Sequence, residues 1–137
     1  MRTRNTIIRH WGIRFLLDFD KHDKERVIRA LLWAGAPDSI IDRATSLVEA
    51  GRQNEGFTYS NPENRRSVTG VGRTDSGPEF MDSAVHEIFH IAQDIATTDD
   101  LNLAGEDIAY LAGDISRSIS DIVCEMSCPH CHKKGPS

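Results

Sequence analysis

The residues of this chain best suited to act together chemically are His86, Glu87 and His90, in the pattern His-Glu-x-x-His. Two histidines four residues apart lie on one face of a helix, so both imidazoles can bind one metal ion. The glutamate between them can accept a proton from a metal-bound water. We expect the pair to face a cleft or solvent, because it lies away from the predicted apolar stripe of its helix, which comprises Val85, Ile88, Phe89, Ala92, Ile95 and Ala96.

A third metal ligand must come from another part of the chain, because a catalytic zinc takes three protein ligands and keeps one position open. Glu106 and Asp107 stand at the start of the next predicted helix. Glu106 falls nearly opposite the apolar stripe of that helix, and Asp107 falls on its flank. Helical phase alone does not choose between the two acids.

The segment GEDIAYLAG at 105–113 follows the histidine motif after a short spacer, and the combination resembles the gluzincin zinc metallopeptidases. The segments 56–61 and 66–74 resemble those of small minigluzincins encoded by phages and bacteria. The resemblance covers roughly residues 53–120 and implies a zincin-like minigluzincin core. It further implies a zinc-dependent hydrolase of peptide bonds in a peptide or protein substrate, with one catalytic Zn²⁺ on His86, His90 and Glu106 and with Glu87 as general base.

Two features of the family are not matched by the same residues here. The aspartate that orients a zinc-binding histidine in the family corresponds to Tyr110, so Asp114 or a backbone carbonyl would have to take that role. Larger family members stabilise the oxyanion with a His or Tyr from a C-terminal domain. In this chain the candidates for that role are Tyr110, Tyr59 and Arg73.

The alternative function is a non-catalytic zinc-binding interaction module on a degenerate peptidase scaffold.

The last fourteen residues concentrate soft metal ligands, so we divide the chain into a single domain at 1–123 and a Cys/His-rich tail at 124–137. The tail contains only one Cys-x-x-Cys knuckle, whereas a structural zinc site needs four ligands. It is therefore a reduced tail, a redox sensor, a cap on the catalytic zinc, or a second zinc site completed by another donor. The ligands of that second metal site would be Cys124, Cys128, Cys131 and His132.

Composition excludes other classes of function. The chain has 16 Lys and Arg against 21 Asp and Glu, a net charge of -5, so we expect no nucleic-acid partner. No apolar run approaches the roughly 20 residues of a membrane-spanning helix, and no signal peptide is recognisable. We therefore expect a cytoplasmic protein without a membrane partner, and the sequence leaves its oligomeric state open.

The pattern of apolar and turn residues predicts an α+β fold with a small mixed or antiparallel sheet and about four helices. A strand is expected at 13–19, and a β-hairpin is expected at 57–60 and 67–72. In gluzincins a strand before the zinc helix forms one wall of the cleft, so the resemblance implies that residues 67–73 take this place, where an edge strand could pair with an extended peptide. The predicted helices lie at 23–35, 37–51, 79–96 and 104–123.

Overall fold

The computed structural model describes residues 1–51 and 55–127. A short 3₁₀ turn precedes the first helix. The elements in chain order are β1 (Arg2–Ile8), β2 (Trp11–Phe19), α1 (Lys24–Trp33), α2 (Asp38–Glu49), β3 (Phe57–Asn61), β4 (Arg66–Gly72), α3 (Gly77–Thr98) and α4 (Glu106–Ser127). Within the described ranges the predicted α+β class, with a four-stranded mixed sheet and four α-helices, is confirmed.

The sheet has the strand order β1-β2-β4-β3. The outer pairs, β1 with β2 and β3 with β4, are antiparallel, and the central pair, β2 with β4, is parallel. The parallel pair of β2 and β4 is connected by α1, α2 and β3, as a parallel pair requires a crossover. The prediction that residues 67–73 form a wall of the cleft with a free edge was wrong, because β4 is paired on both sides, and β3 is the edge strand that lines the cleft. The order of strands within a sheet depends on long-range pairing, which the hairpin sequence does not reveal.

Strand β1 was not predicted. It pairs with β2 through a two-residue turn in which Arg9 and His10 have φ values of 53° and 62°. Both residues in the left-handed region make this a type I′ turn, which normally contains Asn or Gly. Because Arg and His are poor turn signals, the hairpin has no recognisable mark in the sequence.

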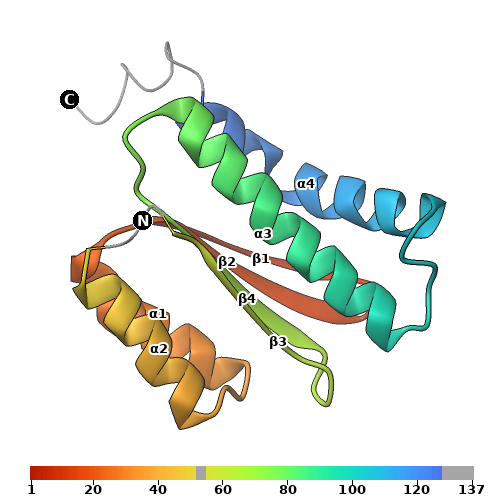
Figure 1. The fold of residues 1–137 in the computed structure, drawn as a ribbon, viewed down its shortest axis with the longest axis horizontal. Helices are drawn as coiled ribbons and strands as arrows, with labels where there is room; N and C mark the ends of the chain where they lie inside the picture. Colours follow the sequence, from red (N-terminus) through yellow and green to blue (C-terminus); the bar gives the residue numbers. More distant parts are fainter. Residues whose placement is uncertain (52–54, 128–137) are drawn as a thin grey trace.

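The sheet lies between two helical layers, with α1 and α2 on one face and α3 and α4 on the other (Figure 1). Alternate residues of β2 serve the two layers: Trp11, Ile13 and Phe15 pack with α3 and α4, and Leu16 packs with α1 and α2. The register shifts at Asp18, whose φ is 66°. The shift allows Phe19 to join the α1 and α2 core.

Helix α3 positions the histidine motif, but its buried face differs from the predicted stripe. Val85 and Phe89 are 57% and 48% exposed, whereas Ala84 and Ile91 are buried. The helix packs on both the sheet and α4, and it turns the buried Glu87 toward polar side chains of the sheet. A prediction from hydrophobicity alone places Glu87 on the solvent side of the helix. The predicted buried face is therefore turned about the helix axis away from the observed one.

Helix α4 continues past the predicted domain boundary, since it ends at Ser127. Cys124 therefore lies on a helix, although the sequence suggested a tail. Among the described residues, no helix has the length and apolar character needed to cross a bilayer.

Candidate metal centre

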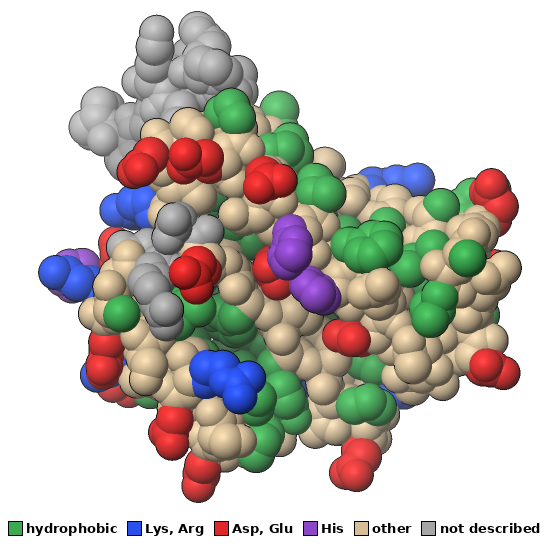
Figure 2. All heavy atoms as spheres, in the orientation of Figure 1, with side chains coloured by type: hydrophobic (Ala, Val, Ile, Leu, Met, Phe, Trp, Pro, Cys, Tyr) green, Lys and Arg blue, Asp and Glu red, His purple; other side chains and the backbone are tan. Residues whose placement is uncertain are grey.

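The two histidines of the motif converge on the exposed side of α3. Their Nε2 atoms are 3.1 Å apart, and the two rings lie edge to face. Figure 2 shows two histidine side chains next to each other on the surface of the molecule. Two nitrogens at the usual zinc distance would be about 3.3 Å apart across a tetrahedral edge. The pair therefore has nearly the separation of two ligands on one zinc ion, and the same 3.1 Å is also the length of a hydrogen bond between the two rings.

Glu87 is buried beside this pair, with 4% of its surface exposed. Its Oε2 lies 4.0 Å from Nε2 of His86, and its Oε1 accepts a 2.9 Å hydrogen bond from Thr58 Oγ1. Thr58 and Thr69 pair across the β3–β4 hairpin with their Oγ1 atoms 2.6 Å apart. Because Thr58 uses its proton on Glu87, Thr69 must donate to Thr58, and the hydroxyl groups form a directed relay to the carboxylate.

A second relay reaches the next acidic residue of the same helix. Trp11 donates from Nε1 to Ser67 Oγ at 2.8 Å, Ser67 lies 2.7 Å from Ser60, and Ser60 donates to Asp94 Oδ2 at 2.6 Å. Asp94 stands one turn after His90. The sheet face beneath α3 thus holds both carboxylates in defined positions, since each accepts a hydrogen bond from a hydroxyl of β3.

Gly56 brings the backbone close to Glu87. A Cβ atom at this position would lie 2.9 Å from both Cγ and Oε2 of the glutamate. Real Cβ atoms almost never come this close to another heavy atom, so a larger residue would displace either the strand or the carboxylate. The glycine therefore fixes how deeply Glu87 is enclosed.

These groups line a cleft of about 460 Å³ between α2 and α3, with β3 along it. His86, Glu87, His90 and Asp94 contribute from α3. The opposite wall consists mainly of residues from α2, which are Ile40, Arg43, Ala44 and Leu47. The size suits a small molecule or a few residues of a peptide.

The third ligand expected from the resemblance is not placed with the histidine pair. Glu106 is exposed as the first residue of α4, and Asp107 accepts a 3.2 Å hydrogen bond from the backbone of Asn102. Within residues 1–51 and 55–127, no group of three His, Cys, Asp or Glu side chains is arranged to hold a metal ion. The structure thus brings together His86, Glu87 and His90, but not Glu106.

The remaining candidates are spread over the molecule. Tyr110 is 68% exposed, and Asp114 is also exposed on α4. Arg73 forms 3.3 Å ion pairs with Asp18 and Asp20, so its guanidinium is held away from the cleft by these carboxylates. Of the three oxyanion candidates, Tyr59 alone lines the cleft.

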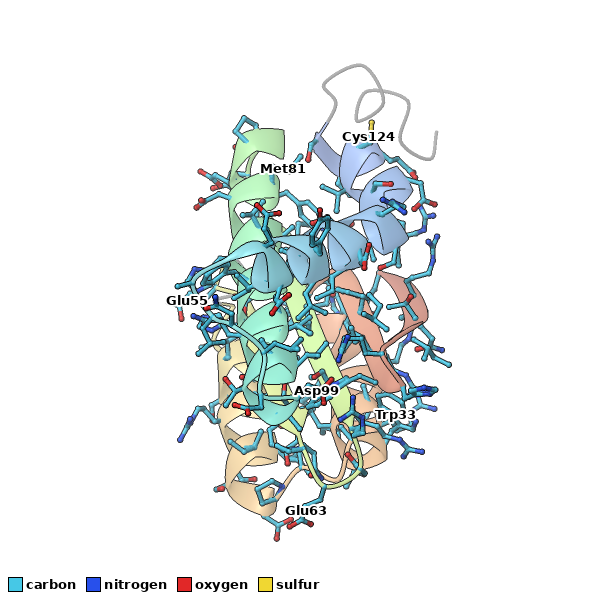
Figure 3. All side chains as sticks on the ribbon, turned by 90° about the vertical axis from the view of Figure 1, so that its right-hand side faces the viewer. Trp33, Glu55, Glu63, Met81, Asp99 and Cys124 are labelled. Carbon is cyan, nitrogen blue, oxygen red and sulfur yellow. The ribbon has the colours of Figure 1, made fainter. Side chains whose placement is uncertain are left out.

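The structure describes one member of the cysteine cluster. Cys124 is exposed near the end of α4 (Figure 3). Cys128, Cys131 and His132 lie outside the described residues, so the second metal site remains a prediction.

Sequence reasoning missed Thr58, Asp94 and Arg43. Asp94 continues the four-residue spacing of His86 and His90, a signal that was available. Thr58 could have been found from the alternation of β3, in which hydroxyl residues alternate with Phe57 and Tyr59. Arg43 carries no local signal, because its place in the cleft depends on how α2 packs.

No family model, curated protein or solved structure matches this chain.

Proposed function

We propose that the protein is a zinc-dependent metallopeptidase of the gluzincin type. The observation that carries the proposal is the approach of the His86 and His90 Nε2 atoms to 3.1 Å at a cleft that also contains the buried carboxylate of Glu87. An exposed histidine pair without a chemical role would need neither the buried glutamate nor its hydroxyl relay. The segment at 105–113 supports the same family on independent residues.

A zinc ion bound by the pair would supply an activated water and polarise the scissile carbonyl. Glu87 accepts the proton of the attacking water and delivers it to the leaving amine. Thr58 holds one carboxylate oxygen, so the other is directed toward His86. Arg43 offers donors along the cleft for carbonyl or carboxylate groups of a peptide. The hydroxyl of Tyr59, which also lines the cleft, donates to the carbonyl of Gly35 at 3.5 Å.

The metal content of the purified protein tests the site. We expect about one zinc per chain, retained in Glu87→Gln and lost in the double variant His86→Ala/His90→Ala. Glu106→Ala and Asp94→Ala identify the third ligand, because loss of a true ligand should reduce zinc affinity by more than the roughly ten to hundred fold that follows loss of a residue that only orients a ligand. Metal that survives loss of both histidines and disappears with Cys124→Ser would contradict the proposal.

Activity is tested separately on a complex peptide mixture, with cleavage read by mass spectrometry. The wild-type protein should produce new termini, and Glu87→Gln should reduce the rate by about 10² to 10⁴ fold while it keeps zinc. Equal cleavage by both proteins would show that Glu87 is not the base.

The second candidate is a zinc-binding interaction module without catalysis. Its support is the exposed position of Glu106 away from the histidine pair. It predicts zinc that depends on His86 and His90, with no cleavage by the wild-type protein under any condition that loads the metal.

A further inference from the structure

Two adjoining hollows lie at the β1 edge of the sheet, on the face that carries α1. The first, of about 310 Å³, is formed by β1, β2 and α1, and is lined by Thr3, Asn5, Arg14, Leu16, Arg26, Arg29 and Ala30. The second, of about 350 Å³, lies beside the β1–β2 and β3–β4 turns. Asn5 and Arg14 line both hollows, so the two adjoin at these side chains.

The charge of these walls is one-sided. Five arginines and His10 line them, and neither wall contains an Asp or a Glu among the residues described. Two of these arginines have carboxylate neighbours outside the walls, since Arg65 pairs with Asp99 at 2.8 Å and Arg26 lies 4.0 Å from Asp23. This segregation occurs in a chain that has more acidic than basic residues and a net charge of -5. A concave surface lined by charges of one sign concentrates ions of the other sign.

Two of the arginines stand close together without a carboxylate. The guanidinium carbons of Arg14 and Arg66 lie 4.1 Å and 4.9 Å from the ring centre of Trp33. Arg14 donates to Asn5, and Arg66 donates to the carbonyl of Trp33, both neutral acceptors. Partial burial and the neighbouring Arg66 lower the pKa of Arg14. An anion between these groups would relieve that repulsion.

We propose that the two hollows bind a small ligand with more than one phosphate group. The planar guanidinium fork suits phosphate oxygens, and Arg14, Arg26 and Arg29 can surround one such group. Arg14 is shared with the second hollow, so a ligand that spans both can place another phosphate near Arg66. The site shares no lining residue with the histidine cleft and does not depend on the proposed peptidase function.

Calorimetric titration with tripolyphosphate, at constant ionic strength, tests this site on the full chain. We expect saturable binding that weakens at least about tenfold in Arg26→Gln/Arg29→Gln, since each lost charged hydrogen bond costs roughly a factor of ten. Both side chains are exposed on α1, so the variant should fold. Arg117→Gln, which removes an exposed arginine from α4, is the matched control and should bind like the wild type.

Three outcomes would overturn the proposal. They are the absence of saturable binding, an equal loss of affinity in Arg117→Gln, and binding of a twelve-nucleotide oligothymidylate without any binding of tripolyphosphate. The last result would assign the arginines to a nucleic-acid backbone. Unchanged affinity in His86→Ala/His90→Ala would show that tripolyphosphate does not act through the histidine cleft.

Discussion

Glu87 shows how a single residue can belong both to a core and to a site. A buried carboxylate is costly unless hydrogen bonds replace its water, and Thr58 supplies one at 2.9 Å. Thr69 in turn orients Thr58 from the neighbouring strand. The burial of Glu87 therefore depends on the hydroxyl residues of β3 and β4 as much as on its own helix.

Replacement of Thr58 tests this dependence. Thr58→Val keeps the shape but leaves one carboxylate oxygen without its donor, so the free energy of unfolding should fall by about 1 to 3 kcal/mol. Thr58→Ser keeps the hydroxyl and should lose less. Urea unfolding at neutral pH measures both, and equal losses would mean that the methyl group matters more than the hydrogen bond.

At the same scale, the spacing of His86 and His90 was sufficient to predict that their rings meet. The third ligand could not be predicted in this way, because its position depends on the loop between α3 and α4 and on how the two helices pack. The burial of Glu87 could not be predicted either, because its hydrogen-bond donor, Thr58, lies 29 residues earlier in the chain.

Among the elements, β4 is the most constrained by its surroundings. Gly70 lies against two aromatic rings, and a Cβ there would be 2.8 Å from Cζ of Phe57 and 2.9 Å from Cε1 of Phe19. The absence of a side chain lets these rings pack across the central strand. The strand can then carry hydroxyl residues on one face and pack against aromatic rings on the other.

Gly70→Ala should therefore lower the free energy of unfolding by about 1 to 3 kcal/mol through overpacking. The control is Gly113→Ala on α4, where an added Cβ meets no atom within 4 Å. That change should raise stability by about 0.5 to 1 kcal/mol, because alanine favours the helix. Thermal unfolding of the two variants compares them, and a neutral Gly70→Ala would contradict the close packing described here.

Elements with a strong internal period were the easiest to predict. The four helices and the β3–β4 hairpin have clear periodicity or turn residues, so their existence followed from the sequence. Strand β1 lacked such a signal, because Arg9 and His10 occupy a turn that usually requires Asn or Gly. The position of β3 at the edge of the sheet was not predicted either. It follows from the pairing of β4 with β2, whose residues are some fifty positions apart in the chain.

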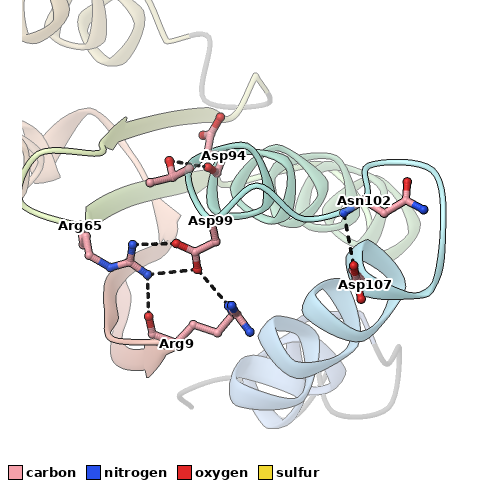
Figure 4. A network of polar contacts seen from close by, with 7 residues as sticks. Arg9, Arg65, Asp94, Asp99, Asn102 and Asp107 are labelled. Carbon is pink, nitrogen blue, oxygen red and sulfur yellow. Dashed lines mark hydrogen bonds and ion pairs between the residues drawn. The ribbon is translucent and has the colours of Figure 1, made fainter.

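The whole molecule is held at one end by a charge network that joins three chain reversals (Figure 4). Asp99 caps the C-terminal end of α3, where a negative charge is unfavourable with the helix dipole. Arg9 from the β1–β2 turn and Arg65 from the β3–β4 turn bond to its carboxylate at 2.9 Å and 2.8 Å. Arg65 also donates to the carbonyl of Arg9, which links the two turns directly.

This network predicts a defined dependence of stability on pH. The hydrogen bonds from Arg65 and Arg9 lower the pKa of Asp99 to about 2. An unfolded aspartate has a pKa of about 3.9, so the stabilisation is complete above about pH 5 and is lost as the pH falls toward 2. Asp99→Asn should cost about 1 to 3 kcal/mol at pH 7, with the contribution of the more exposed Arg9 at the low end.

Urea unfolding of wild type and Asp99→Asn across pH 2 to 7 measures the effect. The difference between the two proteins should be constant from pH 7 to about 5 and should shrink below pH 4. Asp42→Asn, at an exposed position of α2, is the control and should show no comparable difference. A gap between wild type and Asp99→Asn that persists unchanged to pH 2 would mean that shape at the end of α3, and not the charge of Asp99, joins the three turns.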